Sequence, residues 1–133
     1  MTLWLLDTNI ISAVFRDPFG AVALKVQEIP DKDLCTSIIV ACELRFGVEK
    51  RASAKLRQWV ETTLHDLDVQ PFSKDADLHY AKLRAALERK GTPIGNHDML
   101  IAAHALALDC ILVTANIREF ARIEGLRVEN WLD

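Results

Sequence analysis

The sequence is poor in the residues that mark fibrous and disordered chains. Its 133 residues include 5 glycines and 4 prolines, while 50% of them are hydrophobic and 26% are charged. This composition excludes collagen-like, low-complexity and disordered proteins. It predicts a single globular domain over residues 1–133.

Cysteine is scarce as well. The three cysteines, Cys35, Cys42 and Cys110, lie in apolar runs and include no CxxC spacing. An odd number in this arrangement supports neither a disulfide framework nor a zinc site. We therefore expect three buried thiols in a reducing compartment, which predicts a cytoplasmic protein.

Long hydrophobic runs and an excess of positive charge are also missing. The apolar run at residues 3–6 has no basic flank, so we expect neither a secretion signal nor a membrane partner. Asp and Glu number 19 against 16 Lys and Arg, a net charge of −3. A protein that coats nucleic acid through bulk charge needs the opposite balance. Any contact with nucleic acid must therefore be local.

Several catalytic signatures are absent. The sequence has no Gly-rich phosphate loop, no Ser nucleophile elbow and no aromatic platform for single strands. His97 and His104 are seven residues apart, whereas helical metal ligands usually pair at three or four, and His65 and His79 are isolated. We interpret the histidines as solvated or core residues.

What is present is an alternation of strand and helix patterns. Short apolar segments predict strands, and amphipathic segments bounded by capping residues predict helices. The expected strands are residues 3–6, 34–36, 67–72, 111–113 and 127–129, and the expected helices are residues 10–15, 21–28, 38–50, 54–64, 73–90, 96–108 and 117–121. This order predicts an α/β fold, a three-layer α/β/α domain around a parallel sheet of about five strands.

Ligands of such sheets bind beyond the carboxyl ends of the strands. Asp7 directly follows the first strand, and Asp7, Thr8 and Asn9 are also three candidate caps for the next helix. Asn116 follows the strand that leads into Thr114. Both strand ends are therefore site candidates.

Glu43 is harder to explain by local structure. It lies two turns into its helix, where neither capping nor the helix dipole favours it, and Val40 and Phe46 are among its neighbours. A carboxylate buried there without a partner would cost several kcal/mol or become neutral. A structural ion pair with an arginine is one explanation, and a bound cation is the other.

Two further candidates also have plain structural explanations. Asp98 stands in the first turn of a helix that Asn96 could cap, where the dipole alone favours an acid. Asn116 and Glu119 match a capping box. Both remain candidates, because a parallel sheet brings the helix start at Asp98 and the strand end before Asn116 to the same edge.

Four segments contain these candidates in order along nearly the whole chain. They are LLDTNI (5–10), ACELRFG (41–47), IGNHDMLIAA (94–103) and LVTANIREF (112–120). Together they resemble PIN-domain proteins, specifically the VapC-type toxin ribonucleases of bacterial toxin–antitoxin pairs. The resemblance places Asp7, Glu43 and Asp98 on the metal-binding acids of the family and Asn116 on its fourth catalytic position.

The resemblance implies a metal-dependent endoribonuclease. Mg²⁺ or Mn²⁺ on the three acids would activate a water that hydrolyses an RNA phosphodiester bond. Without these three acids, 16 acids would balance 16 Lys and Arg, so the excess negative charge equals the expected site. Thr8, Asn9 and Thr114 are expected beside the RNA phosphate.

The resemblance also implies partners. We expect a small cognate antitoxin, and a homodimer or higher assembly. The pattern of Phe46, Val48, Trp59 and Val60 predicts an apolar groove beside the acids, which either the domain's own packing closes or a partner helix fills.

Two other classes of function stay open. One is a haloacid-dehalogenase-like phosphatase with Asp7 as nucleophile, against which Asn9 counts because that chemistry needs a second Asp there. The other is a non-catalytic module whose acids bind a metal or a partner.

Overall fold

The computed structural model describes residues 2–132, which form a five-stranded parallel sheet. The strands are β1 (Trp4–Leu6), β2 (Leu34–Ser37), β3 (Asp68–Gln70), β4 (Ile111–Val113) and β5 (Val128–Glu129). Their order across the sheet is β3-β2-β1-β4-β5, and every neighbouring pair is parallel. All the carboxyl ends therefore share one edge. The strand order reverses at β1 and β4, which is where such sheets open a ligand crevice.

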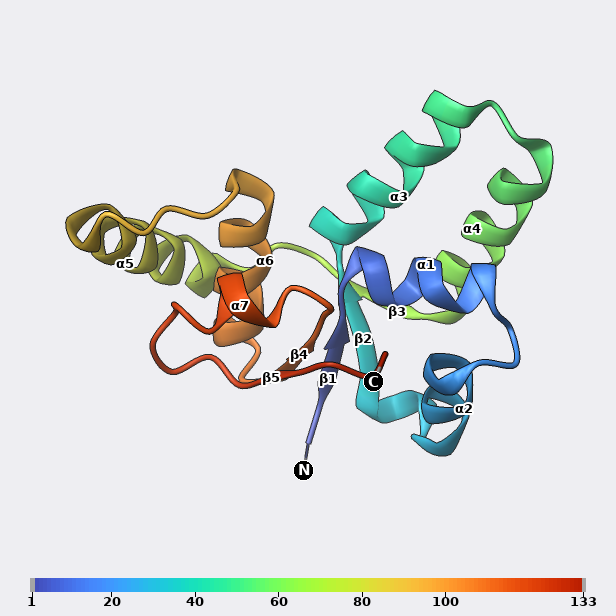
Figure 1. Ribbon diagram of the computed structural model, residues 1–133, viewed down its shortest axis with the longest axis horizontal. Helices are drawn as coiled ribbons and strands as arrows, with labels where there is room; N and C mark the ends of the chain where they lie inside the picture. The colour runs from blue at the N-terminus through green and yellow to red at the C-terminus, as the bar shows by residue number, and fades with distance from the viewer. Residues whose placement is uncertain (1, 133) are drawn as a thin grey trace.

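Helices cover both faces of this sheet. They are α1 (Thr8–Arg16), α2 (Ala21–Glu28), α3 (Ile38–Arg51), α4 (Ala54–Asp66), α5 (Lys74–Lys90), α6 (Asn96–Ala107) and α7 (Ile117–Phe120), with a 3₁₀ turn at Asp31–Asp33. Helices α1 to α4 lie on one side of the sheet and α5 to α7 on the other (Figure 1). The predicted three-layer α/β/α fold is confirmed.

The core lies where the two helical layers meet the sheet. Its fully buried side chains include Leu5, Ile10, Ile101, Leu112 and Phe120. The central strands β1 and β4 are covered on both faces, which is why they are short continuous apolar runs rather than alternating ones. No helix within residues 2–132 is both long and apolar enough to cross a lipid bilayer.

Three local expectations were wrong. Helix α1 begins two residues earlier than predicted, because Asp7 adopts the extended N-cap conformation and its Oδ1 accepts a hydrogen bond from the Thr8 amide at 2.8 Å. Helix α6 has Gly95 at its N-cap position, and Asn96 is its first helical residue rather than its cap. Cys42 is exposed on α3, whereas Cys35 and Cys110 are buried.

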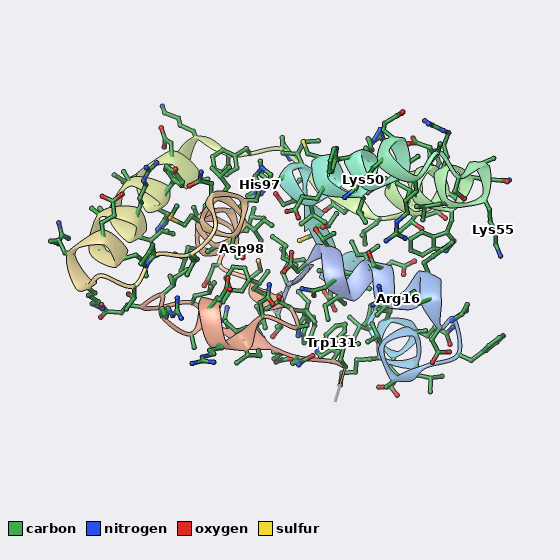
Figure 2. The ribbon with its side chains drawn as sticks, turned by 45° about the horizontal axis from the view of Figure 1, so that its top comes forward. Arg16, Lys50, Lys55, His97, Asp98 and Trp131 are labelled. Atoms are coloured by element: carbon green, nitrogen blue, oxygen red, sulfur yellow. The ribbon has the colours of Figure 1, made fainter. Side chains whose placement is uncertain are left out.

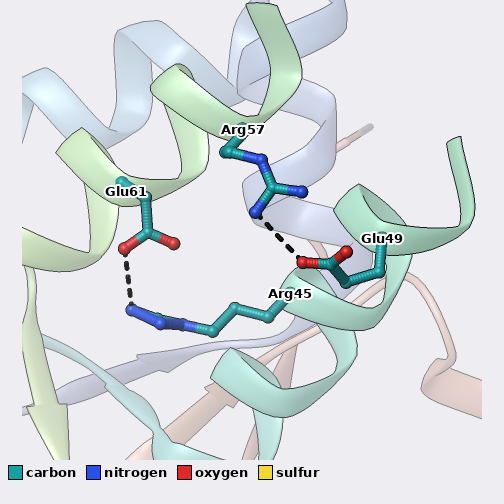
Figure 3. Close-up of polar contacts among 4 residues, drawn as sticks. All are labelled: Arg45, Glu49, Arg57 and Glu61. Atoms are coloured by element: carbon teal, nitrogen blue, oxygen red, sulfur yellow. Dashed lines mark hydrogen bonds and ion pairs between the residues drawn. The ribbon is translucent and has the colours of Figure 1, made fainter. Parts of the chain in front are cut away.

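Helices α3 and α4 form an antiparallel hairpin that two ion pairs join (Figure 3). Arg45 contacts Glu61 at 3.1 Å, and Arg57 contacts Glu49 at 3.0 Å. Half or more of each of these side chains is exposed, so solvent screens both pairs and they contribute little to stability. Arg45 and Arg57 are therefore each already paired with a glutamate of the other helix.

Candidate active site

Asp7 is fixed at the crevice between β1 and β4. Its amide donates to the Val113 carbonyl oxygen at 2.9 Å, and its side chain is almost completely buried. The Thr114 hydroxyl donates to Asp7 Oδ2 at 2.7 Å and accepts from the Asn116 amide at 3.0 Å. Burial raises the pKa of Asp7, and the hydrogen bonds from Thr114 and the Thr8 amide oppose that rise.

The side chains predicted to contact RNA divide into two groups. Asn9 Oδ1 accepts from the Ala115 amide at 3.0 Å, and the Thr114 hydroxyl is held by Asp7, so both stabilise the loop after β4. Thr8 Oγ1 differs from them. It is buried and has no hydrogen-bond partner within the described part of the chain.

Glu43 extends from α3 toward this crevice. Its Oε1 is buried and has no hydrogen-bond partner among residues 2–132. The structural ion pair that would explain Glu43 is absent from these residues, and nearby Arg45 contacts Glu61 instead. Burial is the main cause that raises the pKa of Glu43, and the charge of Asp7 raises it further.

His97 is a neighbour that the sequence interpretation set aside. It is exposed in the first turn of α6 and lies between α6 and the start of α3 (Figure 2). Electrostatic interaction with His97 lowers the pKa of Glu43, as does the nearby Thr8 hydroxyl. No hydrogen bond of standard geometry joins Thr8 to Glu43. No spacing rule for metal ligands could have found His97.

Asp98 and Glu119 form a pair of carboxyl groups. Burial, a hydrogen bond with Glu119 and the charges of Asp7, Glu119 and Glu43 together raise the pKa of Asp98 to about 7. The predicted capping box is wrong, because the Asn116 side chain is exposed and makes no capping hydrogen bond. Glu119 faces Asp98 instead. From the sequence, Glu119 was predicted only as part of the capping box.

The acids come from four elements and act on one another electrostatically. Asp7 raises the pKa of both Glu43 and Asp98, so all three lie within one field of negative charge. No three His, Cys, Asp or Glu side chains between residues 2 and 132 converge closely enough to enclose an ion as they stand. The site is thus a group of repelling carboxylates, with the buried Glu43 Oε1 unpartnered.

A buried hydrogen bond ties together the helices that carry Glu43 and Asp98. Ser37 caps α3 by accepting from the Ile39 amide at 3.0 Å, and its Oγ lies 2.7 Å from His104 Nδ1 on α6. His104 is completely buried, as expected of a core histidine, and burial lowers its pKa. The start of α3 is therefore anchored to the middle of α6.

A cavity of about 200 Å³ lies next to Glu43, between α1, α3 and α4. Trp59 and Val60 line it as predicted. The other two residues predicted there do not: Phe46 is 67% exposed, and Val48 is buried in the core. Val48 lies five residues beyond Glu43 and so on another face of α3, whereas Phe46 projects into solvent.

Known proteins resemble this chain over almost its whole length. A family model described as PIN domain matches residues 4–126. The tRNA(fMet)-specific endonuclease VapC of Salmonella typhimurium is 41% identical over 132 residues, which cover 98% of this chain and 99% of the relative. Ribonuclease VapC2 of Rickettsia felis is 38% identical over 131 residues, 97% of this chain and 98% of the relative.

A solved structure shows the same similarity in three dimensions. It is VapBC2 from Rickettsia felis bound to a DNA fragment from their promoter, with a TM-score of 0.89 and 36% sequence identity. The match covers 98% of this chain and 99% of that chain.

Proposed function

This chain belongs to the PIN-domain family and, within it, to the VapC ribonucleases, and from that premise we propose that it is the endoribonuclease toxin of a toxin–antitoxin pair. It hydrolyses RNA phosphodiester bonds in the cytoplasm at the crevice that holds Asp7, Glu43 and Asp98. The observation that supports this site is the unpartnered, buried Oε1 of Glu43 among mutually repelling carboxylates. Buried carboxylate oxygens ordinarily have a hydrogen-bond partner, so this one is available to a ligand.

The chemistry of these donors fits a hard divalent cation. Mg²⁺ and Mn²⁺ prefer carboxylate oxygens, and a cation offsets the burial and the mutual repulsion that together raise the pKa of Asp98 and Glu43. We propose that Asp7, Glu43 and Asp98 hold the ion, with Glu119 as a further carboxylate and Asn116 as a weaker amide ligand. When bound, the ion acidifies water and offsets the charge that builds on the phosphate.

The other residues of the crevice orient the reacting groups. The Thr114 hydroxyl and the Thr8 amide hold both oxygens of the Asp7 carboxylate in place. The unpartnered Thr8 hydroxyl donates a hydrogen bond to a phosphate oxygen of the RNA. The bond between Ser37 and His104 keeps α3 and α6, and with them Glu43 and Asp98, at a fixed separation.

The partners follow from the relatives. The similar solved structure contains VapBC2, so we propose that a small cognate antitoxin holds this chain inactive and that the chain assembles as a homodimer or a higher oligomer. The relative from Salmonella typhimurium is named for tRNA(fMet), which makes tRNA the substrate to test first.

The test is cleavage of purified tRNA with and without Mn²⁺. We expect wild-type protein to cut internally, EDTA to abolish cutting, and Asp7→Asn to lose activity by at least about a hundredfold. The control is Glu124→Gln, which removes the same charge from an exposed residue of the segment after α7. Metal-independent cutting, or full activity of Asp7→Asn, would contradict the proposal. Metal binding without cleavage would favour the non-catalytic module.

A further inference from the structure

The cavity beside Glu43 has a polar wall on α1. Thr8, Ser12 and Arg16 line it and are spaced four residues apart, so they follow one another along one face of the helix. Thr8 stands at the crevice end of this row, and Arg16 stands in the last turn. Because a helix rises about 1.5 Å per residue, Arg16 lies roughly 12 Å along α1 from Thr8.

The wall on α3 repeats this arrangement. Glu43, Gly47 and Arg51 line the cavity at the same spacing of four residues. The row again begins at the acids and ends at an arginine in the last turn. Helices α1 and α3 start side by side at the strand ends and then diverge, with α4 between their far ends (Figure 1). We call this wedge, with its rows Thr8–Ser12–Arg16 and Glu43–Gly47–Arg51, the α1–α3 groove.

The positive charge at the wide end of the groove is not used within the fold. Neither Arg16 nor Arg51 makes an ion pair with another residue between 2 and 132, whereas Arg45 and Arg57 on the α3–α4 hairpin are both paired. Figure 2 shows Arg16 on the same side of the molecule as Lys50 and Lys55, away from Asp98. A basic residue in the last turn also suits the helix dipole, so the arginines need a second observation.

Gly47 supplies that observation. It lies in the interior of α3, where glycine is the least favourable residue after proline. Close packing does not explain it, because a Cβ at Gly47 would meet no atom within 4 Å. A side chain at this position would instead enter the groove. The absence of a side chain at Gly47 therefore leaves a space in the groove that no other residue between 2 and 132 fills.

The floor of the groove is aromatic. Phe15 and Trp59 meet edge to face with ring centroids 5.1 Å apart, and Trp59 is half-buried. Aromatic faces of this kind stack on nucleic-acid bases without sequence preference. The sequence pattern predicted Trp59 at this groove but not Phe15, because the two rings are far apart in the chain.

We propose that the α1–α3 groove binds the RNA strand that runs away from the scissile phosphate, with Arg16 and Arg51 on a neighbouring phosphate and a base against Trp59. The proposal rests on the proposed ribonuclease function and names how that site recognises its substrate. Charge favours RNA over a basic peptide, because the wide end of the groove is cationic. A protein with a net charge of −3 can bind RNA only through a local cluster of positive charge, and Arg16 and Arg51 form such a cluster.

The test measures binding of a short fluorescein-labelled single-stranded RNA by fluorescence anisotropy, with Ca²⁺ present as a hard cation that keeps cutting slow. For Arg16→Ala/Arg51→Ala we expect at least about tenfold weaker binding. The slope of log affinity against log salt should become shallower by about 1.4, since each phosphate contact on a single strand contributes about 0.7. The control Arg89→Ala/Lys90→Ala removes the same charge from the far end of α5 and should bind within about twofold of wild type.

Gly47 provides a test that does not depend on charge. Gly47→Ala and Gly47→Leu should keep or raise the melting temperature, because both are better helix formers, while RNA affinity falls in the order Gly, Ala, Leu. Normal RNA binding by Gly47→Leu overturns the proposal, and so does an arginine double variant that matches its control. Loss of antitoxin binding alone, with RNA binding unchanged, would assign the groove to the protein partner and also overturn it.

Cleavage in Mn²⁺ separates this inference from the proposed function. If wild type cuts RNA and the groove variants cut and bind like their control, only the groove assignment fails. If wild type binds RNA through Arg16 and Arg51 but never cuts, the groove assignment stands and the ribonuclease function fails. If wild type neither binds nor cuts RNA, both fail.

Discussion

Replacing Asp98 by Asn should stabilise the metal-free protein in a way that depends on pH. In the unfolded chain Asp98 ionises near its ordinary pKa of 3.8, whereas in the fold its pKa rises to about 7. Between these values the folded state binds more protons, so raising the pH removes stability. Asn cannot ionise and avoids this loss. The stability of Asp98→Asn relative to wild type should therefore grow as pH rises from 4 to 8.

The size of the effect follows from the shift. A rise of about three pKa units corresponds to at most about 4 kcal/mol. Because Asp98 shares its proton with Glu119 and remains partly hydrated, we expect about half of that, or about 2 kcal/mol at pH 8. For a domain of this size that is a rise in melting temperature of roughly 6 °C. At pH 4 the folded Asp98 is protonated and, like Asn, uncharged, so the difference should be small.

The assay is urea denaturation in EDTA at pH 4 and pH 8, for wild type, Asp98→Asn and the exposed control Glu124→Gln. Comparing variant with wild type at each pH cancels the contribution of the buried His104. Saturating Mn²⁺ should then stabilise wild type more than Asp98→Asn, because the variant binds the ion more weakly. The reasoning is refuted if Asp98→Asn is destabilised at pH 8, or if its gain is equal at both pH values.

Three further predictions concern neighbouring residues. Ser37→Ala should lower the free energy of unfolding by about 2–3 kcal/mol in urea titrations, because it removes a cap and leaves buried His104 Nδ1 unpartnered. The control Ser53→Ala removes only a helix cap and should lower it by about 1 kcal/mol. Equal losses in the two variants would contradict this prediction. Glu43→Gln should raise the melting temperature of the metal-free protein at pH 8, since burial and Asp7 both disfavour the Glu43 charge; a lower melting temperature would count against it. Asn116→Asp should tighten Mn²⁺ binding several-fold in calorimetry; unchanged affinity would place Asn116 outside the ion's ligands.

The fold could be predicted from the sequence because its signals are local. Strand β4 matches the expected residues 111–113, because a short continuous apolar run between polar residues is typical of a strand that is buried on both faces. The position of Asp7 at the crevice was also predictable, because it directly follows a central parallel strand and the crevice lies beyond the carboxyl ends of such strands. Glu43 was identified because no local role explained it.

What could not be predicted depends on side-chain direction in three dimensions. Glu119 fits a capping box in sequence, yet α7 is a single turn whose orientation is set by packing, and this turns Glu119 toward Asp98. Cys42 lies in an apolar stretch but on the outer face of α3. The hydrogen bond from the Thr114 hydroxyl to Asp7 could not be predicted either, because it depends on how the end of β4 directs this side chain.

The central claim is that Asp7, Glu43 and Asp98 form one metal site. Calorimetric titration of Mn²⁺ into wild type, Asp7→Asn, Glu43→Gln, Asp98→Asn and the control Glu124→Gln tests it most directly. We predict a well-defined binding event in wild type and in Glu124→Gln, and a loss of at least about tenfold in affinity in each of the other three. Equal Mn²⁺ binding by all five proteins would contradict the claim and return these acids to separate structural roles.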